Sequence, residues 1–292
     1  MYKIPLSNPI FILLKSHRFF NLFLIAVLIL GAHSQTYAQG NLLVTPRRVV
    51  FDGQKSTQEL NLANTGKDTA RYLISMIEIR MKEDGTFEKI TQPDSGQQFA
   101  STYLRYFPRS VTLAPGEAQA VKVQLTRVGK LAPGEYRSHL YFRAVPVEKP
   151  LGQEEGTKDS SNLSVHLTPV FGLSIPALIR IGTPDTEVKI EDISLNLQDE
   201  GIPSLQMAFK RTGNMSAYGD LTVDFISDKG KSTRVGNIKG IAVYTPTKSR
   251  QFRVNLDKLK DASYHEGKLH IVYSAPAEAK SSKIAETEFV LK

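Results

Sequence analysis

The stretch LSVHLTPVFGLSIPALIRI, residues 163–181, decides which fold the sequence predicts. Every odd position in it is apolar, whereas the even positions are largely polar or small, with Val170, Pro176 and Leu178 as the exceptions. Successive side chains of a strand point to opposite faces, so this alternation predicts a β-strand. Its nineteen residues would extend roughly 60 Å, while an ordinary strand has about five or six residues. One domain's core cannot cover a row of that length.

Two interpretations of this run follow from its residues. In the first, the strand overruns its own sandwich and leaves an apolar row exposed near Leu163, Val165 and Leu167, which indicates a partner strand. In the second, the run is two ordinary strands that break at Pro169 or Pro176, both buried within this chain. The residues alone favour the second interpretation, because long alternating runs commonly belong to a core.

The rest of the chain repeats short alternating runs with Gly, Pro, Asn or Asp between them, and no stretch after residue 38 keeps apolar residues at helical spacing. Before the long run we expect strands at 42–51, 58–62, 70–79, 118–125 and 136–145. After it we expect strands at 187–197, 204–210, 219–227, 240–244, 250–256, 268–274 and 284–291. This pattern predicts an all-β protein with two immunoglobulin-like β-sandwich domains, 39–181 and 182–292, set at an angle with a cleft between them.

The first 38 residues have the order of a secretory signal peptide. Lys3, Lys15 and Arg18 precede the run Phe19–Leu30, whose twelve residues are apolar except Asn21. Twelve residues rise only about 18 Å as a helix, against a hydrocarbon core of roughly 30 Å, so the run is too short for a membrane anchor. We therefore expect cleavage after residue 38 and no membrane span afterwards. The net charge then falls from +8 to 8 − 3 = +5.

The composition of the 292 residues excludes several function classes. The chain has no Cys, which excludes disulfide frameworks, thiol nucleophiles and Cys-ligated metals. Lys and Arg alternate with acids along the chain, so no nucleic-acid partner is expected. The four histidines after the signal have no metal-ligand spacing, and no G-x-S-x-G motif occurs. We expect no enzyme, no catalytic or metal site and no cofactor. The four histidines are His139, His166, His265 and His270.

Four stretches together resemble the PapD-like periplasmic chaperones of pilus assembly, over essentially the whole chain after the signal. RRVVFDG at 47–53 is similar to the family's opening strand, and QELNLANTG at 58–66 to its second strand and turn. LAPGEYRSHLYFRAVP at 131–146 resembles the signature that precedes a mobile loop. The polar segment at 148–162, whose composition predicts such a loop, and the alternating residues after it are similar to the loop and donor strand.

The resemblance implies a chaperone that lends an edge strand to pilin-like subunits in the periplasm. In this family an outer-membrane usher can be a second partner. The implied subunit-binding residues are Arg48, Leu163, Val165 and Leu167. Arg48 corresponds to one member of a basic pair that holds the subunit's terminal carboxylate, and a guanidinium can hold a carboxylate bidentately. From the residue alone, a solvated strand charge is the other interpretation.

The sequence also departs from the family. The second anchor should be a Lys in 168–172, but these residues read TPVFG. His139 and Tyr141 replace the signature's usual aromatic residue and Asn. We therefore interpret the chain as a divergent member with altered carboxylate anchoring. The alternative is a client-free immunoglobulin-like structural or adhesive exported protein, whose long strand would be fully covered by its own chain.

Overall fold

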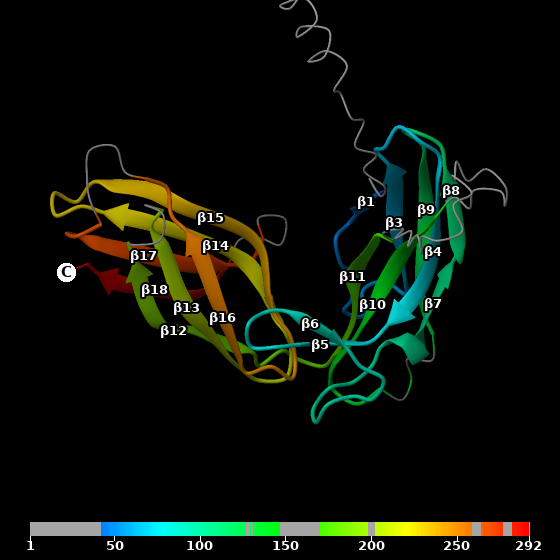
Figure 1. The fold of residues 1–292 in the computed structure, drawn as a ribbon. Helices are drawn as coiled ribbons and strands as arrows, with labels where there is room; N and C mark the ends of the chain where they lie inside the picture. Colours follow the sequence, from blue (N-terminus) through cyan, green and yellow to red (C-terminus); the bar gives the residue numbers. More distant parts are fainter. Residues whose placement is uncertain are drawn as a thin grey trace, which may run out of the picture. The chain divides into compact units, whose positions relative to one another are not determined.

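The computed structural model describes residues 42–126, 129, 131–146, 170–197, 202–258, 264–276 and 282–291. These ranges contain strands and one short 3₁₀ helix, Ser101–Tyr103, and no helix in them is long and apolar enough to cross a membrane. The strands form two β-sandwiches, so the predicted fold class is confirmed (Figure 1). The predicted signal peptide, the predicted loop and Leu163, Val165 and Leu167 lie outside the described residues.

The first sandwich consists of a four-stranded and a five-stranded sheet. The four-stranded sheet has the order β1 (Leu42–Thr45), β3 (Thr57–Asn64), β9 (Ala118–Leu125), β7 (Leu104–Phe107). The five-stranded sheet has the order β2 (Val49–Phe51), β11 (Gly172–Ile181), β10 (Gly134–Val145), β4 (Ala70–Ile77), β8 (Ser110–Leu113). Alternate apolar residues of both sheets, such as Leu60 and Phe142, fill one core between them.

The expected strand at 42–51 is wrong as a single element, because β1 and β2 belong to different sheets. β1 pairs antiparallel with β3, whereas β2 pairs parallel with β11. Pro46 stands between them and has no N–H with which to continue a ladder. The chain therefore leaves one sheet there and enters the other, which places Arg48 directly before β2.

In the described part of the chain, the second sandwich contains seven strands in two sheets, the number of strands that the sequence predicts after residue 181. One sheet has the order β12 (Glu187–Asn196), β13 (Ser204–Thr212), β16 (Ser249–Asn255). The other has the order β15 (Ser232–Val243), β14 (Ala217–Ile226), β17 (Lys268–Ser274), β18 (Lys283–Val290). Its separate core includes the fully buried Phe209, Leu221 and Ile271. The expected strand at 240–244 is only the end of the longer β15.

A two-stranded hairpin, β5 (Ile79–Met81) and β6 (Phe87–Lys89), contacts both sandwiches. Met81 packs with Leu178 of β11 and with Ala242 and Tyr244 of the second sandwich. The Thr247 hydroxyl donates to the Met81 carbonyl at 2.7 Å. The sequence prediction missed this hairpin because it extended one strand through residue 79, whereas β4 ends at Ile77.

Candidate functional site

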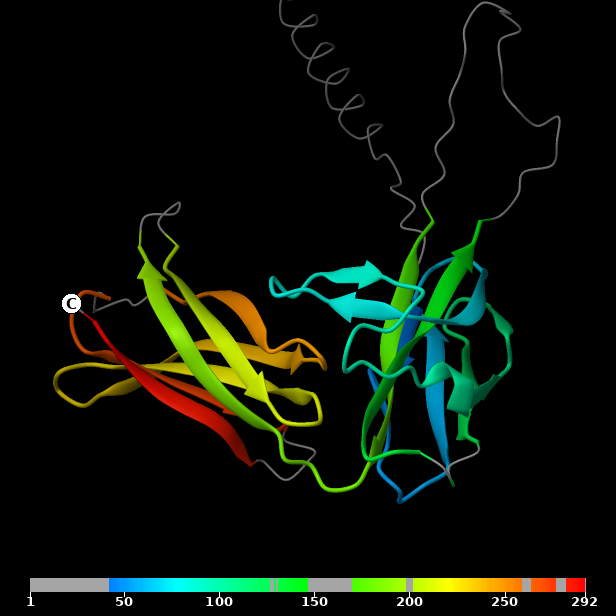
Figure 2. The same ribbon diagram turned by 90° about the horizontal axis from the view of Figure 1, so that it is seen from below.

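Within the part of the predicted long strand that the structure describes, residues 170–181, the most exposed residues are those around the beginning of β11. β10 pairs with the whole length of β11, from Gly134 opposite Ile181 to Arg143 opposite Gly172 (Figure 2). On the other side, β2 pairs only with Ala177–Ile179. Residues 172–176 therefore have no partner strand on that side among the described residues, and we call them the free edge. Unpaired strand edges are sites at which another chain can add a strand.

Apolar side chains accompany the free edge. Phe171 is 50% exposed and Leu173 is 39% exposed, whereas Ile175 is only 3% exposed. The register places Leu173 opposite Phe142, and Ile175 lies opposite Leu140, so Leu173 and Ile175 lie on the core side of the sheet. Considering only the described residues, the core side of the first sandwich is exposed at Leu173 and buried from Ile175 onward. The predicted break at Pro176 is wrong, since β11 continues through Pro176. The alternative break at Pro169 lies outside the described residues.

Two residues that depart from the family signature lie next to this strand. The Tyr141 ring occupies the place that a side chain on Gly172 would take, so the strand approaches that ring closely because residue 172 is glycine. His139 is 3% exposed, and its ring lies 5.9 Å from the Phe87 ring and 6.0 Å from the Tyr244 ring. Burial, aided by the charge of Arg137, lowers the pKa of His139 to about 3. His139 is therefore a neutral packing residue at neutral pH.

Arg48 lies where the free edge ends, because the next residue, Val49, pairs with Ala177. Its guanidinium carbon is 3.9 Å from the centroid of the Tyr218 ring. Its Nε is buried and has no hydrogen-bond partner in the described part of the chain. Burial lowers the pKa of Arg48, and the charge of Arg180 adds to this effect. Arginine remains charged in proteins, so this partly buried cation is suited to an anion.

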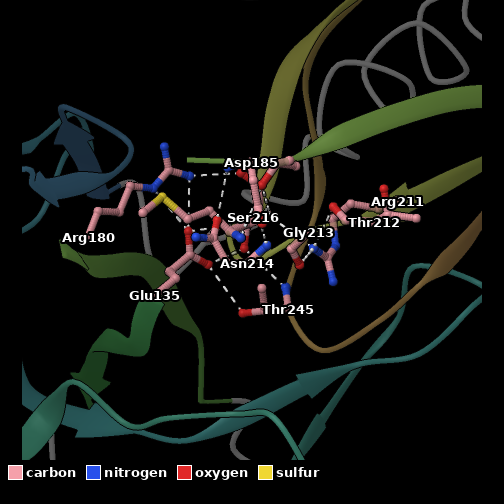
Figure 3. Close-up of polar contacts among 11 residues, drawn as sticks. Glu135, Arg180, Asp185, Arg211, Thr212, Gly213, Asn214, Ser216 and Thr245 are labelled. Carbon is pink, nitrogen blue, oxygen red and sulfur yellow. Dashed lines mark hydrogen bonds and ion pairs between the residues drawn. The ribbon is translucent and has the colours of Figure 1, made fainter. Parts of the chain in front are cut away.

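The nearest buried acid, Glu135, is already engaged by another arginine (Figure 3). Its side chain is fully buried, and its carboxylate lies 3.0 Å from Nη2 of Arg180. The same carboxylate accepts hydrogen bonds from the backbone N–H and hydroxyl of Ser216 and from the hydroxyl of Thr245. Arg180 also donates to the Ser216 carbonyl at 2.8 Å. Glu135 therefore forms its ion pair with Arg180, and this network joins β10 and β11 to the second sandwich.

Sequence reasoning missed Glu135 and Tyr218, because their partners come from distant parts of the chain. It identified Arg48 by resemblance alone, and the structure places Arg48 beside the free edge. The other three predicted binding residues lie outside the described ranges, so their position relative to Arg48 stays a prediction. Among the described residues, no group of His, Asp or Glu is arranged to hold a metal ion.

No protein-family model and no curated protein matches the chain. Among solved structures, it is similar to the CupB2 chaperone of Pseudomonas aeruginosa, with 12% identity, a TM-score of 0.42, and 86% of this chain and 100% of that chain covered. It is also similar to a chain of the CsuC–CsuE chaperone–tip subunit complex from archaic Csu pili of Acinetobacter baumannii, with 15% identity, a TM-score of 0.42, and 85% and 98% covered. CupB2 is a chaperone, and the Csu complex contains a chaperone and a tip subunit.

Proposed function

We propose that the protein is a periplasmic chaperone that binds pilin-like subunits by lending them an edge strand. The observation that carries this proposal is the free edge of β11, which has exposed apolar residues at its start and Arg48 at its end. In this proposal residues 1–38 are a cleavable signal peptide, 39–181 form the subunit-binding domain and 182–292 form a second domain. The role is binding, not catalysis, and a cell-surface fibre is the product of assembly.

The free edge suits a subunit that lacks a strand of its own. Backbone groups of residues 172–176 can pair with the subunit, and apolar side chains on the core side of the sheet can enter its open core. Each such side chain that leaves water contributes roughly 1.5 to 3 kcal/mol before the costs of ordering. Leu163, Val165 and Leu167 continue the same alternation as Phe171 and Leu173, so we assign them to the same row.

The place of Arg48 also gives the subunit strand a direction. β11 runs from Gly172 toward Ile181, and Arg48 lies beside the Ala177 end of the free edge. A strand whose terminal carboxylate reaches Arg48 ends at that same end, so it runs parallel to β11. A charge-assisted hydrogen bond between the two contributes about 1.5 to 3 kcal/mol.

Capture from periplasm tests the proposal with a pair of neighbouring substitutions. Tagged wild-type protein should co-purify with pilin-like subunits, and Val165→Asp should abolish their capture because an unpaired carboxylate would enter an apolar core. His166→Asp is the matched control, since adjacent strand residues face opposite sides, and it should capture nearly as much as wild type. If both substitutions leave capture intact, or if no pilin-like subunit co-purifies with wild type, the proposal fails. In that case the client-free structural or adhesive protein becomes the better interpretation.

A further inference from the structure

The partner of the Arg48 side chain comes from the second sandwich. Tyr218 lies in β14, and its ring centroid is 3.9 Å from the Arg48 guanidinium carbon. An aromatic face attracts a guanidinium through its negative quadrupole, and more strongly where water is excluded. The Arg48 Nε is buried without a hydrogen-bond partner among the described residues, and contact with the Tyr218 ring offsets part of its loss of water. The Arg48 terminal amino groups make no hydrogen bond or ion pair with the described residues and remain available for a ligand.

The Tyr218 ring lies next to an irregularity of β15. The register between β14 and β15 shifts between Gly219 and Leu221, and the backbone there includes Gly240 with φ of +77°. A Cβ atom at Gly240 would lie 3.1 Å from the Tyr218 hydroxyl oxygen, so the missing side chain leaves room for that hydroxyl. The Gly240 N–H donates to Oδ1 of Asp220 at 2.9 Å, which fixes this part of β15.

Among the described residues, Arg48 forms no ion pair with an acid, although the charge of Glu135 favours its protonated form. Arg180 is the other nearby arginine, and its charge is balanced by Glu135 at 3.0 Å. A long side chain that is free to rotate loses conformational freedom when it binds, and a side chain already held against a ring loses less. A ring in contact with Arg48 therefore lowers the entropy cost of binding, because it fixes the guanidinium before a ligand arrives.

We propose that Tyr218 is a positioning residue that holds the Arg48 guanidinium ready for a carboxylate, so that the second sandwich completes the anion site at the end of the free edge. This inference rests on the proposed function for the identity of the carboxylate, which is the subunit's chain end. It differs from the proposed function in assigning a binding contribution to the second sandwich. In this arrangement Arg48, held by Tyr218, binds the carboxylate alone, whereas the family resemblance predicts a pair of basic residues.

Acetate titration of the isotope-labelled chain without its signal peptide tests the positioning directly, because acetate is the simplest carboxylate. The probes are the NMR signals of the Arg48 Nε–H group and of the Val49 amide, with sodium chloride at equal ionic strength as the control. In wild type, both signals should move with acetate and not with chloride. The midpoint is the acetate concentration at which half of the signal shift has occurred. Tyr218→Phe keeps the ring and should keep this midpoint. Tyr218→Leu should raise the midpoint about tenfold, as expected for loss of a cation–π contact.

A double-mutant cycle protects the test against a general loss of structure. Arg48→Lys keeps the charge but loses the planar group, so Tyr218→Leu should have much less effect in the Arg48→Lys background than in wild type, with the Val49 amide as the probe. Equal acetate midpoints for Tyr218→Phe and Tyr218→Leu would overturn the inference, and so would an Arg48 signal that does not respond to acetate. Subunit capture is a separate measurement: if acetate binding depends on Tyr218 but no subunit is captured, the proposed function fails and the positioning role stands.

Discussion

β11 has two different surroundings along its length. From Ala177 to Ile179 it lies between β10 and β2, and these residues are fully buried. From Gly172 to Pro176 the only neighbouring strand in the described ranges is β10, and Leu173 is 39% exposed although it belongs to the same alternating row. Among the described residues, the row is fully buried where β2 covers it, and it becomes exposed only at the start of the free edge, since Ile175 is still 3% exposed whereas Leu173 is 39% exposed. One sequence pattern therefore supplies both core residues and an exposed edge at which a strand can be added.

The largest expected difference between the buried part of β11 and its exposed beginning is in the free energy of unfolding. Ile179→Ala should cost about 2 to 5 kcal/mol of unfolding free energy, because it removes buried methyl groups and leaves a cavity between two paired strands. Phe171→Ala removes a larger side chain, but this side chain is half exposed, so the loss should stay below about 1 kcal/mol. Urea unfolding midpoints of the two variants measure the contrast. Similar losses would show that residue 171 belongs to the core of the free protein.

A medium effect is expected from His139, which lies opposite Pro176 where the two halves meet. Its folded pKa of about 3 lies below an unfolded value of about 6.5, so the unfolded chain takes up the proton first as the pH falls. The stability associated with neutral His139 is therefore complete above pH 6.5 and is lost as the pH falls toward 3. Between pH 7 and pH 5 the unfolding free energy should drop by about 2 kcal/mol, at roughly 1.4 kcal/mol per pH unit below 6.5.

Urea unfolding at the two pH values measures this loss, and His139→Phe is the matched variant because it keeps a ring beside Phe87 and Tyr244. That variant should lose most of the pH dependence. If wild type and His139→Phe lose the same stability between pH 7 and pH 5, other groups account for the acid sensitivity and His139 is accessible to water.

The smallest effect is expected at Gly172, at the start of the free edge. Gly172→Ala forces the Tyr141 ring to move, but that ring is partly exposed and can turn away at about 0.5 to 1.5 kcal/mol. Alanine also stabilises a strand relative to glycine, by roughly 0.5 to 1 kcal/mol of unfolding free energy. The net change in unfolding free energy should therefore stay within about 1 kcal/mol. In a Tyr141→Ala background, Gly172→Ala should become stabilising, and a double-mutant cycle of thermal melts would show whether it does.

The alternation along residues 163–181 and the turns around it were enough to predict strands and two sandwiches, because both signals are local. The point where β2 begins to cover β11 was not predictable, since it depends on where the chain changes sheets at Pro46. Glu135, Arg137 and His139 lie on the face opposite the core residue Leu140, so their alternation predicts exposed polar side chains. They are instead only 3%, 1% and 3% exposed, because segments far away in the sequence cover that face.

The β5–β6 hairpin has a consequence for self-association. β16 is the last strand of its sheet, and the carbonyl of Glu83, in the hairpin turn, accepts the backbone N–H of Gln251 on that strand at 2.6 Å. A donor that is already satisfied cannot recruit the backbone of a neighbouring molecule. A protein that keeps one apolar strand edge open in a crowded compartment risks adding its own copies there and growing into fibres. Because the hairpin occupies a backbone donor of β16, it makes this second strand edge less able to pair with another copy of the protein.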